Sequence, residues 1–512
     1  MSNKYTDTMK LQLIKRASQS FLLIALLALI ISCARNPVTG KREIMLVSES
    51  QELQMGLQSD PGIIANFGLY QDEEMQEFIN VKGKEMGAIS HRPDLEYKFR
   101  ILDSPVVNAF AVPGGFVYFT RGIMAHFSNE AEFAGVLGHE IGHITARHSA
   151  SQMSKQQLYG GLFAVGMIVS EEFRQFGQAA QQGLGALFLK FGRDDESQSD
   201  ELGVDYSTQI GYNAHEMANF FAVLNNLQSQ AGVNIPEWQS THPDPANRYE
   251  NVHALADKYQ KGVDKSKLKI NRDSWLELID GIIYGEDPRQ GFVENNNFYH
   301  PELKFQFPIP ANWRLSNTPQ AVQMAEQEGN AIMLMTVSQA KTLQEAAQAA
   351  AEQYQMTVQE SANVNVNGNN AIAMISDIVQ EAQQGQQQGQ QAAPSLRVLS
   401  YFIEYNGLIY QLHGVAEAAK FNSYYPVFSN TMTNFRDLFD PNKINRQPER
   451  IKIMTVPRAT TFEQALQAYN QAPDKVETLS ILNNIALNAQ LPAGTKIKVL
   501  STANSSNRFG RD

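Results

Sequence analysis

The chain has 512 residues, of which 43% are hydrophobic and 19% are charged, and this composition is typical of folded globular proteins. A chain of this length exceeds what one hydrophobic core usually serves, so we expect two or three domains. The formal net charge of −11 argues against the basic surface that binds nucleic acid, and we expect no nucleic-acid partner.

The N-terminal segment has the layout of a secretory signal. The basic residues Lys10, Lys15 and Arg16 precede an apolar run at residues 21–31, which is too short to span a bilayer comfortably. The run ends at Cys33, the only cysteine of the chain. The sequence Ile-Ile-Ser-Cys at this point resembles a bacterial lipobox, in which the cysteine is lipidated; a plain signal peptide is the alternative.

These residues lead to an expected location. We expect residues 1–32 to be a lipoprotein signal peptide and Cys33 to anchor the mature chain on the periplasmic side of the cell envelope. Ala34 follows the cysteine in place of aspartate, which resembles sorting to the outer membrane. With Cys33 modified, no thiol remains for a disulfide.

The first domain is expected at residues 33–290. Helical periodicity dominates residues 48–271, with an extended stretch at 96–120. Within that stretch, residues 97–102 alternate like a strand, and residues 106–120 predict two short strands around a Pro-Gly-Gly turn.

Two further units are expected downstream. Residues 296–440 predict an α+β domain, with a small module at 451–505 that contains a helix and a terminal strand. Within the α+β domain the sequence predicts strands at residues 303–307, 371–378 and 399–412, a helix at 342–354, and a Gln/Gly tract at 383–391. The first of these units weakly resembles PsbP/Mog-like domains and the second a LysM-like module. The fold class is therefore α+β.

The most informative residues lie on a helix that begins near Ser128 or Asn129, either of which can cap it. His139 and His143 are one turn apart, so both imidazoles can reach one metal ion. Glu140 lies beside them, where it can hold a metal-bound water and move its proton. This His-Glu-x-x-His pattern predicts a zinc peptidase centre.

Such a centre needs a third protein ligand. Metzincin spacing would place a histidine at Ser149, so the pattern is not that of a metzincin. His148 lies five residues beyond His143, which turns it away from the metal face, and we expect it at the surface or beside a ligand. Downstream, Glu196 and Asp200 share a helix face, so one could bind zinc while the other orients a histidine. An acidic helix start that faces solvent is the alternative.

These motifs resemble peptidase family M48, the gluzincins, and in particular its periplasmic lipoprotein proteases of the BepA and LoiP type. The family pattern is His-Glu-x-x-His followed by a Glu-x-x-x-Asp helix. The resemblance implies a helix-rich zincin-like protease domain with a small sheet and one zinc ion per chain. It implies that the zinc ligands are His139, His143 and Glu196, that Glu140 is the general base, and that Asp200 supports a ligand.

Two further segments resemble the family, and the resemblance covers about residues 34–290. The run Asn108-Ala109-Phe110-Ala111 is similar to its active-site edge strand, to which a substrate adds as another strand. His242 and Arg248 are similar to a downstream pair. In related proteases the equivalent of His242 can close onto zinc as a fourth ligand, and that of Arg248 would stabilise the charged tetrahedral intermediate.

Two features depart from the family or remain open. Gln198 and Ser199 stand where the family often has Glu and Ala, which we expect to alter packing under the site. The apolar segment 158–191 is either a core helix or a lid or membrane-facing hairpin over the cleft; its runs are too short to span a bilayer.

The sequence thus predicts a zinc-dependent endopeptidase of the cell envelope. The resemblance implies protein or peptide substrates, namely misfolded or misassembled envelope proteins, with the C-terminal domains available for envelope-protein partners. The alternative is an envelope chaperone or assembly factor that uses the same cleft to bind proteins. An intact metal triad with Glu140 favours the enzyme.

Overall fold

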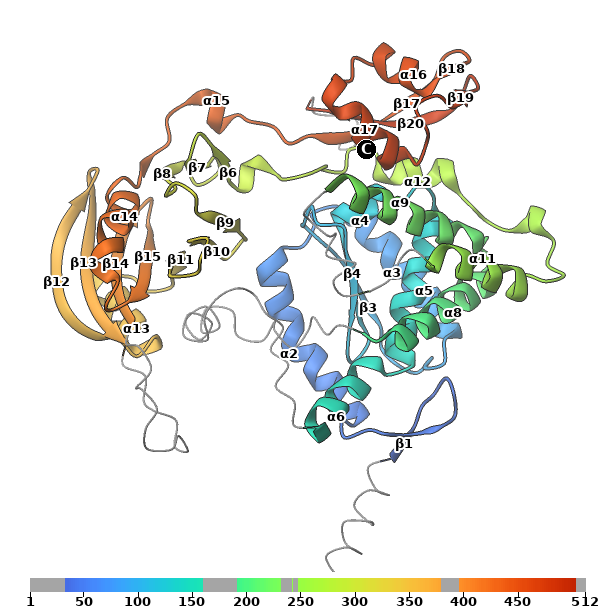
Figure 1. The fold of residues 1–512 in the computed structure, drawn as a ribbon, viewed down its shortest axis with the longest axis horizontal. Coiled ribbons are helices and arrows are strands. Elements are labelled where there is room, and N and C mark those ends of the chain that lie inside the picture. Colours follow the sequence, from blue (N-terminus) through green and yellow to red (C-terminus); the bar gives the residue numbers. More distant parts are fainter. Residues whose placement is uncertain (1–32, 160–190, 232–241, 243–246, 379–395, 503–512) are drawn as a thin grey trace, which may run out of the picture.

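The structure is a computed structural model, and it describes residues 33–159, 191–231, 242, 247–378 and 396–502. Figure 1 shows a helix-rich part, a separate β-rich part, and a C-terminal segment that lies against the helix-rich part. The fold class is α+β, as predicted. Across the described ranges, no helix combines the length and the apolar character that crossing a membrane requires.

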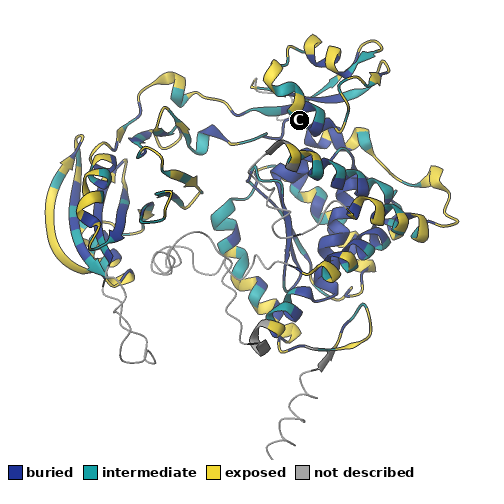
Figure 2. Cartoon of the chain, viewed as in Figure 1, coloured by how far each residue is buried: buried dark blue, intermediate teal, exposed yellow. Residues whose placement is uncertain are grey.

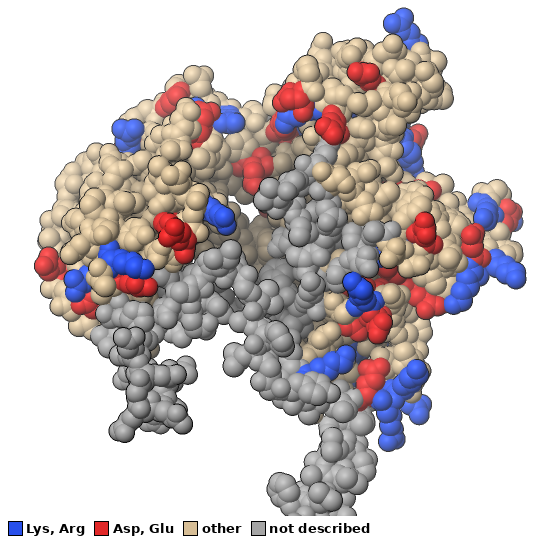
Figure 3. Space-filling view, viewed as in Figure 1, with Lys and Arg blue, Asp and Glu red and all other residues tan. Residues whose placement is uncertain are grey.

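Three sequence predictions fall on residues outside the described ranges. They are the signal peptide at 1–32, nearly all of the apolar segment 158–191, and the Gln/Gly tract at 383–391. On the face of the molecule drawn in Figure 3, basic and acidic side chains are interspersed.

The helix-rich part is built around a small sheet of three strands in the order β3-β5-β4. The strands lie where the sequence predicts them: β3 (Lys98–Leu102), β4 (Ala109–Val112) and β5 (Phe116–Thr120). Gly114 and Gly115 connect β4 to β5 with φ values of +90° and +100°, a conformation that glycine adopts without strain. Because β4 pairs only with β5 within this sheet, it is an edge strand.

Helices cover this sheet and carry the candidate site. Figure 2 shows that their inward faces are buried, and the capped helix predicted after Asn129 is α5. The helices of this part are α2 (Glu49–Phe67), α3 (Glu73–Ile89), α4 (Arg121–His126), α5 (Glu130–Thr145), α6 (His148–Tyr159), α8 (Arg193–Gln209), α9 (His215–Ala231), α11 (Arg248–Tyr259), η1 (Lys265–Lys267) and α12 (Arg272–Ile279), with a short N-terminal pair β1 (Cys33–Arg35) and β2 (Arg42–Ile44).

The β-rich part contains a seven-stranded antiparallel sheet in the order β12-β13-β14-β15-β11-β10-β9 and a four-stranded sheet in the order β16-β8-β7-β6. The elements are η2 (Pro288–Gln290), β6 (Phe292–Glu294), β7 (Asn297–His300), β8 (Phe305–Pro308), β9 (Arg314–Asn317), β10 (Ala321–Ala325), β11 (Ala331–Ser338), α13 (Leu343–Gln353), β12 (Thr357–Val366), β13 (Asn369–Ile378), β14 (Leu396–Tyr405), β15 (Leu408–Glu417), α14 (Phe421–Thr433), β16 (Arg436–Asp437) and α15 (Pro441–Ile444).

Both faces of the central strands of the large sheet are covered. In β14, Leu399 and Tyr401 belong to the hydrophobic cluster that includes α14, whereas Val398 and Phe402 belong to the cluster that includes α13. This alternation is the period of two that a strand imposes on its side chains. The outermost strand β12 is largely exposed in Figure 2.

The C-terminal segment shares its hydrophobic core with the helix-rich part. Its elements are β17 (Arg450–Thr455), β18 (Thr460–Thr461), α16 (Phe462–Ala468), η3 (Pro473–Lys475), α17 (Val476–Asn483), β19 (Gln490–Leu491) and β20 (Lys496–Ser501). Ile451, Phe462 and Val499 belong to the same buried cluster as Phe133 of α5. The β-rich part is therefore inserted between two segments that pack together.

The two crossings into and out of the β-rich part lie side by side. Gly281 N donates to Ile451 O over 2.8 Å, Ile451 N donates to Ile282 O over 2.9 Å, and Tyr284 N donates to Glu449 O over 2.8 Å. The chain thus leaves the helix-rich part and returns to it at one place.

A buried lysine ties the C-terminal segment to the region before α5. Lys498 is 1% exposed, and its ammonium donates to the carbonyls of Ala125, Phe127 and Leu482 over 2.8–2.9 Å. Burial lowers the pKa of Lys498 to about 7, opposed by the charge of Glu132 on α5. A lysine is rarely buried completely unless its donors are satisfied, so these bonds hold the segment against the helices.

The substitution Lys498→Met tests this attachment. It removes the ammonium that donates to three buried carbonyls, of which Phe127 O still accepts from Trp275 Nε1. We expect the free energy of unfolding to fall by roughly 2–4 kcal/mol, measured by denaturant unfolding followed by circular dichroism. Lys496→Met, two residues earlier in β20, is the matched control because Lys496 pairs with Glu277 and Asp273 near the surface; it should cost about 1 kcal/mol or less. Equal effects of the two substitutions, or a gain in stability with Lys498→Met, would contradict the attachment.

Candidate metal site

The first two candidate ligands lie on α5. Asn129 caps this helix by accepting a hydrogen bond from Glu132 N, and acidic residues occupy its positive first turn. His139 and His143, which are 0% and 2% exposed, direct their Nε2 atoms to one point, where these atoms are 3.0 Å apart. Burial lowers the pKa of both imidazoles, so both offer neutral lone pairs.

The third candidate ligand comes from α8, which lies against α5 through glycine residues. A Cβ atom added at Gly138 would lie 2.9 Å from Gly203 Cα, which is closer than a side chain tolerates. This close approach puts Glu196 Oε2 3.6 Å from His139 Nε2 and its Oε1 3.4 Å from His143 Nε2. Glu196 is 3% exposed, so the alternative of a solvent-facing acidic helix start is wrong for this residue.

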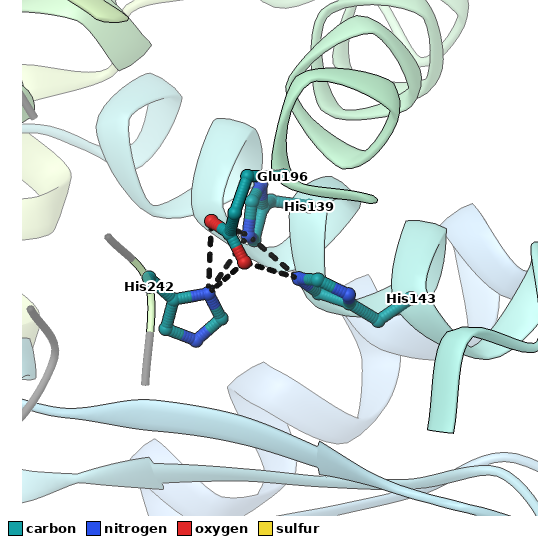
Figure 4. A group of neighbouring side chains, drawn as sticks. All are labelled: His139, His143, Glu196 and His242. Atoms are coloured by element: carbon teal, nitrogen blue, oxygen red, sulfur yellow. Dashed lines mark hydrogen bonds and ion pairs between the residues drawn. The ribbon is translucent and has the colours of Figure 1, made fainter. Parts of the chain in front are cut away.

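His242 joins the same group. Its Nδ1 lies 2.9 Å from Glu196 Oε1 and 3.3 Å from His139 Nε2 (Figure 4). His139, His143, Glu196 and His242 each offer one ligand atom within 4.8 Å of the others, and all four are buried. Three imidazoles and one carboxylate at this spacing fit a divalent metal such as zinc.

The protonation of Glu196 suits this role. Although burial raises its pKa, the charge of His242 and the nearby imidazoles of His143 and His242 hold the pKa of Glu196 well below its usual range. The group is therefore an ionised carboxylate facing imidazole nitrogens, which is the form that binds a cation.

Asp200 orients one ligand. His139 Nδ1 lies 2.9 Å from Asp200 Oδ1, so the Nδ1–H donates to the carboxylate and the Nε2 lone pair faces the cluster. Arg248 in turn donates from its Nε to Asp200 Oδ2 over 2.8 Å, and its Nη1 lies 3.2 Å from Glu196 Oε2. The guanidinium also lies over the ring of Phe221, 4.2 Å from its centroid.

Glu140 is the buried carboxylate beside the cluster. It is 0% exposed, and neither of its oxygens has a hydrogen-bond partner among the described residues. Burial raises its pKa to about 7, opposed by the charge of His242, whose Nε2 lies 3.8 Å from Glu140 Oε1. A carboxylate with free acceptor atoms and a raised pKa can both take and return a proton near neutral pH.

The predicted substrate strand also lies at this site. Ala109, Phe110 and Ala111 belong to the edge strand β4, and the backbone of Ala111 is near enough to Glu140 to lower its pKa. Asn108 precedes the strand, and its Oδ1 is buried without a hydrogen-bond partner among the described residues. A free strand edge can accept an extended peptide.

Most of the residues singled out in the sequence come together here, and His148 takes the second of its two expected places, beside a ligand, whereas the contacts of Phe191 and Gln198 were missed. Phe191 stacks on His143 with ring centroids 4.1 Å apart, and His148 Nδ1 lies 3.0 Å from His143 Nδ1. Gln198 Oε1 lies 2.9 Å from His148 Nε2. Gln198, two residues after Glu196, could have been found from its helical position. For Cys33 the structure gives only its backbone position in β1.

The comparisons with known proteins match this part of the chain. Residues 73–256 match peptidase family M48. The chain is 30% identical over 232 residues to a beta-barrel assembly-enhancing protease of Yersinia pestis, covering 43% of this chain and 47% of that protein. It is 27% identical over 238 residues to the Escherichia coli (strain K12) protein of that name, covering 45% and 49%.

A mitochondrial metalloendopeptidase OMA1 of Arabidopsis thaliana is 30% identical over 179 residues, covering 35% of each chain. The chain thus spans about half the length, or less, of these curated relatives. Among solved structures, cyanobacterial PsbP from Synechocystis sp. PCC 6803 matches with 10% identity and a TM-score of 0.22, covering 28% of this chain and 91% of that one.

The substitution Glu196→Ala tests the ligand group. It removes the only carboxylate of the cluster, and we expect bound metal, measured by mass spectrometry after dialysis against trace zinc, to fall from one ion per chain to a small fraction. Glu201→Ala on the same helix is the control, since Glu201 pairs with exposed Lys258 and should leave the metal content unchanged. Equal metal content in the two variants would contradict this ligand group.

Proposed function

Residues 73–256 are a peptidase family M48 domain, and on that premise we propose that the chain is a zinc-dependent endopeptidase of the cell envelope that holds one zinc ion on His139, His143 and Glu196. One observation carries the proposal: four buried ligand atoms lie within 4.8 Å of one another, beside the buried carboxylate of Glu140. The family match supports the metallopeptidase class, and the metal, its ligands and the substrates are further parts of the proposal.

The proposed mechanism assigns one role to each side chain. Zinc, when bound, polarises a peptide carbonyl and acidifies a water molecule. Glu140 takes the proton of that water and later gives it to the leaving amine, which its raised pKa suits. The substrate backbone adds to the edge of β4 through Ala109 and Ala111. Arg248 stabilises the oxyanion of the tetrahedral intermediate through Nη1, which lies 3.2 Å from Glu196 Oε2.

We assign its substrates by analogy with relatives named for the assembly of beta-barrel proteins. Misfolded or misassembled envelope proteins are the substrate class. A lipid on Cys33 would hold the chain on the periplasmic side, at the outer membrane, and the β-rich and C-terminal parts offer surfaces for envelope-protein partners. The lipobox-like sequence before Cys33 supports this placement.

His242 is proposed to keep the enzyme latent. Its Nδ1 lies among the atoms of the other three ligands, where it would fill the coordination position that water or substrate needs. Activity then requires His242 to leave this position.

The substitution Glu140→Gln separates the enzyme from a chaperone that uses the same cleft. Removing the proton acceptor should lower casein cleavage by about 10²–10⁴-fold, with metal content and casein binding unchanged. Glu250→Gln, an exposed position on α11, is the control and should cleave like the parent chain. Unchanged cleavage or unchanged degradation of envelope proteins in Glu140→Gln, with zinc bound, favours the chaperone.

The substitution His242→Ala tests latency. If His242 occupies the metal in nine of ten molecules, its removal raises the rate of casein cleavage about tenfold, with zinc retained by the three other ligands. His215→Ala, a histidine of α9 outside the cluster, should leave the rate unchanged. A rate equal to or below that of the parent chain in His242→Ala, at full zinc content, would refute the gate.

A further inference from the structure

His148 is a buried histidine that the mechanism above does not use. It is 3% exposed, and its Nδ1 lies 3.0 Å from Nδ1 of His143, with the two rings nearly perpendicular at 74°. Arg147, with φ +60°, ends α5 in the left-handed conformation, and α6 starts at His148. This sharp turn places the His148 ring beside Nδ1 of His143, away from the Nε2 atom that faces the other ligands.

Two ring nitrogens at 3.0 Å can form a hydrogen bond only if one carries a proton and the other does not. If the proton is on His143 Nδ1, then His143 Nε2 has a free lone pair that faces Glu196 and His139. If the proton is instead on His148 Nδ1, neutral His143 must carry its own proton on Nε2. That proton would then face the ligand cluster, where a metal ion needs a lone pair. Only the first arrangement permits metal binding.

The surroundings of His148 select the first arrangement. Its Nε2 lies 2.9 Å from Gln198 Oε1 and 3.9 Å from Asp195 Oδ1, and both of these oxygens accept hydrogen bonds. Nε2 therefore carries the proton, and a neutral His148 has a bare Nδ1 that accepts. Ser199 Oγ lies farther from the same Nδ1, at 3.3 Å.

From this geometry we infer that His148, held by Gln198, is a positioning residue that fixes which ring nitrogen of His143 carries the proton and thereby the affinity of His143 for the metal. The inference rests on the metal site of the proposed function. The two ligand histidines are oriented in different ways: His139 donates to the carboxylate of Asp200, whereas His143 donates to a neutral imidazole. The neutral partner adds no charge beside the metal.

The experiment measures zinc affinity by competition with a chromophoric chelator in the full chain. His148→Leu removes the acceptor, and we expect the dissociation constant for zinc to rise about 10–100-fold. His148→Asn restores an acceptor oxygen near the position of Nδ1, and the dissociation constant should return to within a few fold of the parent value. Denaturant unfolding of the metal-free chains checks that both variants fold equally well.

Two more variants test the direction of the chain of hydrogen bonds. Gln198→Met, at a half-buried position, removes the acceptor that holds the proton on His148 Nε2 and should weaken zinc binding less than His148→Leu does. Ser199→Ala, which touches the same His148 nitrogen but lies outside the line from Gln198 to His143, should bind zinc like the parent chain.

The outcomes separate this inference from the proposed function. A parent chain that binds no zinc refutes the metal site itself. A parent chain that binds zinc, with His148→Leu equally tight, refutes the positioning role alone. Failure of His148→Asn to recover binding, when it folds as stably as His148→Leu, shows a packing role for the ring and also overturns the inference. If His148→Leu does not fold, Gln198→Met decides: parent-like affinity counts against the role.

Discussion

The site depends on the contact between α5 and α8 at residues without side chains. A Cβ atom at Gly203 would lie 2.8 Å from Gly135 O, and one at Gly142 would lie 3.1 Å from Leu202 Cβ. Helices with larger side chains at their contact lie 8–10 Å apart, and their backbones do not meet. Here the two backbones come close together. The side chain of Glu196 on α8 can therefore reach the imidazoles on α5. A methyl group at this contact would push the carboxylate away from its partners.

A second layer of buried charge keeps that geometry. Arg248 pairs with Asp200 and faces Glu196, so one guanidinium neutralises two carboxylates that would otherwise repel each other. Removing one member of a buried set of this kind leaves the others uncompensated, which costs more than the set contributes in total. The ligands and the groups behind them are therefore energetically coupled.

The local half of the site could be predicted from the sequence, because His139, Glu140 and His143 lie within one and a half turns of a helix whose cap is also local. The other half depends on how distant helices pack. The spacing of Glu196 and Asp200 is compatible both with a solvent-exposed helix face and with a metal site. Only the close approach of α8 to α5 decides between these two interpretations. The contact of His148 with His143 depends on one backbone angle, at Arg147, which the sequence does not reveal.

For the fold, too, elements with a local sequence signal were predicted and those without one were missed. The strands at β3, β5 and β13 were predicted because they alternate or turn at glycine. Strand β12 was missed because it is a polar edge strand with little apolar alternation, and α14 was missed because Pro426 lies inside it. The shared core of the C-terminal segment was also missed. Lysine side chains are usually exposed, so the burial of Lys498 gives no local signal.

The chain enters and leaves the β-rich part at one place, and this has a consequence for the evolution of such a chain. Tyr284 and Glu449 are joined by a backbone hydrogen bond, so the ends of the β-rich part are already adjacent. A part attached in this way can gain residues, lose residues or be replaced by another domain without disrupting the hydrophobic core that contains α5. Evolution can thus remodel the surface of the β-rich part while the buried site stays fixed, and a short linker between residues 284 and 449 is the natural route to a chain that keeps only the site.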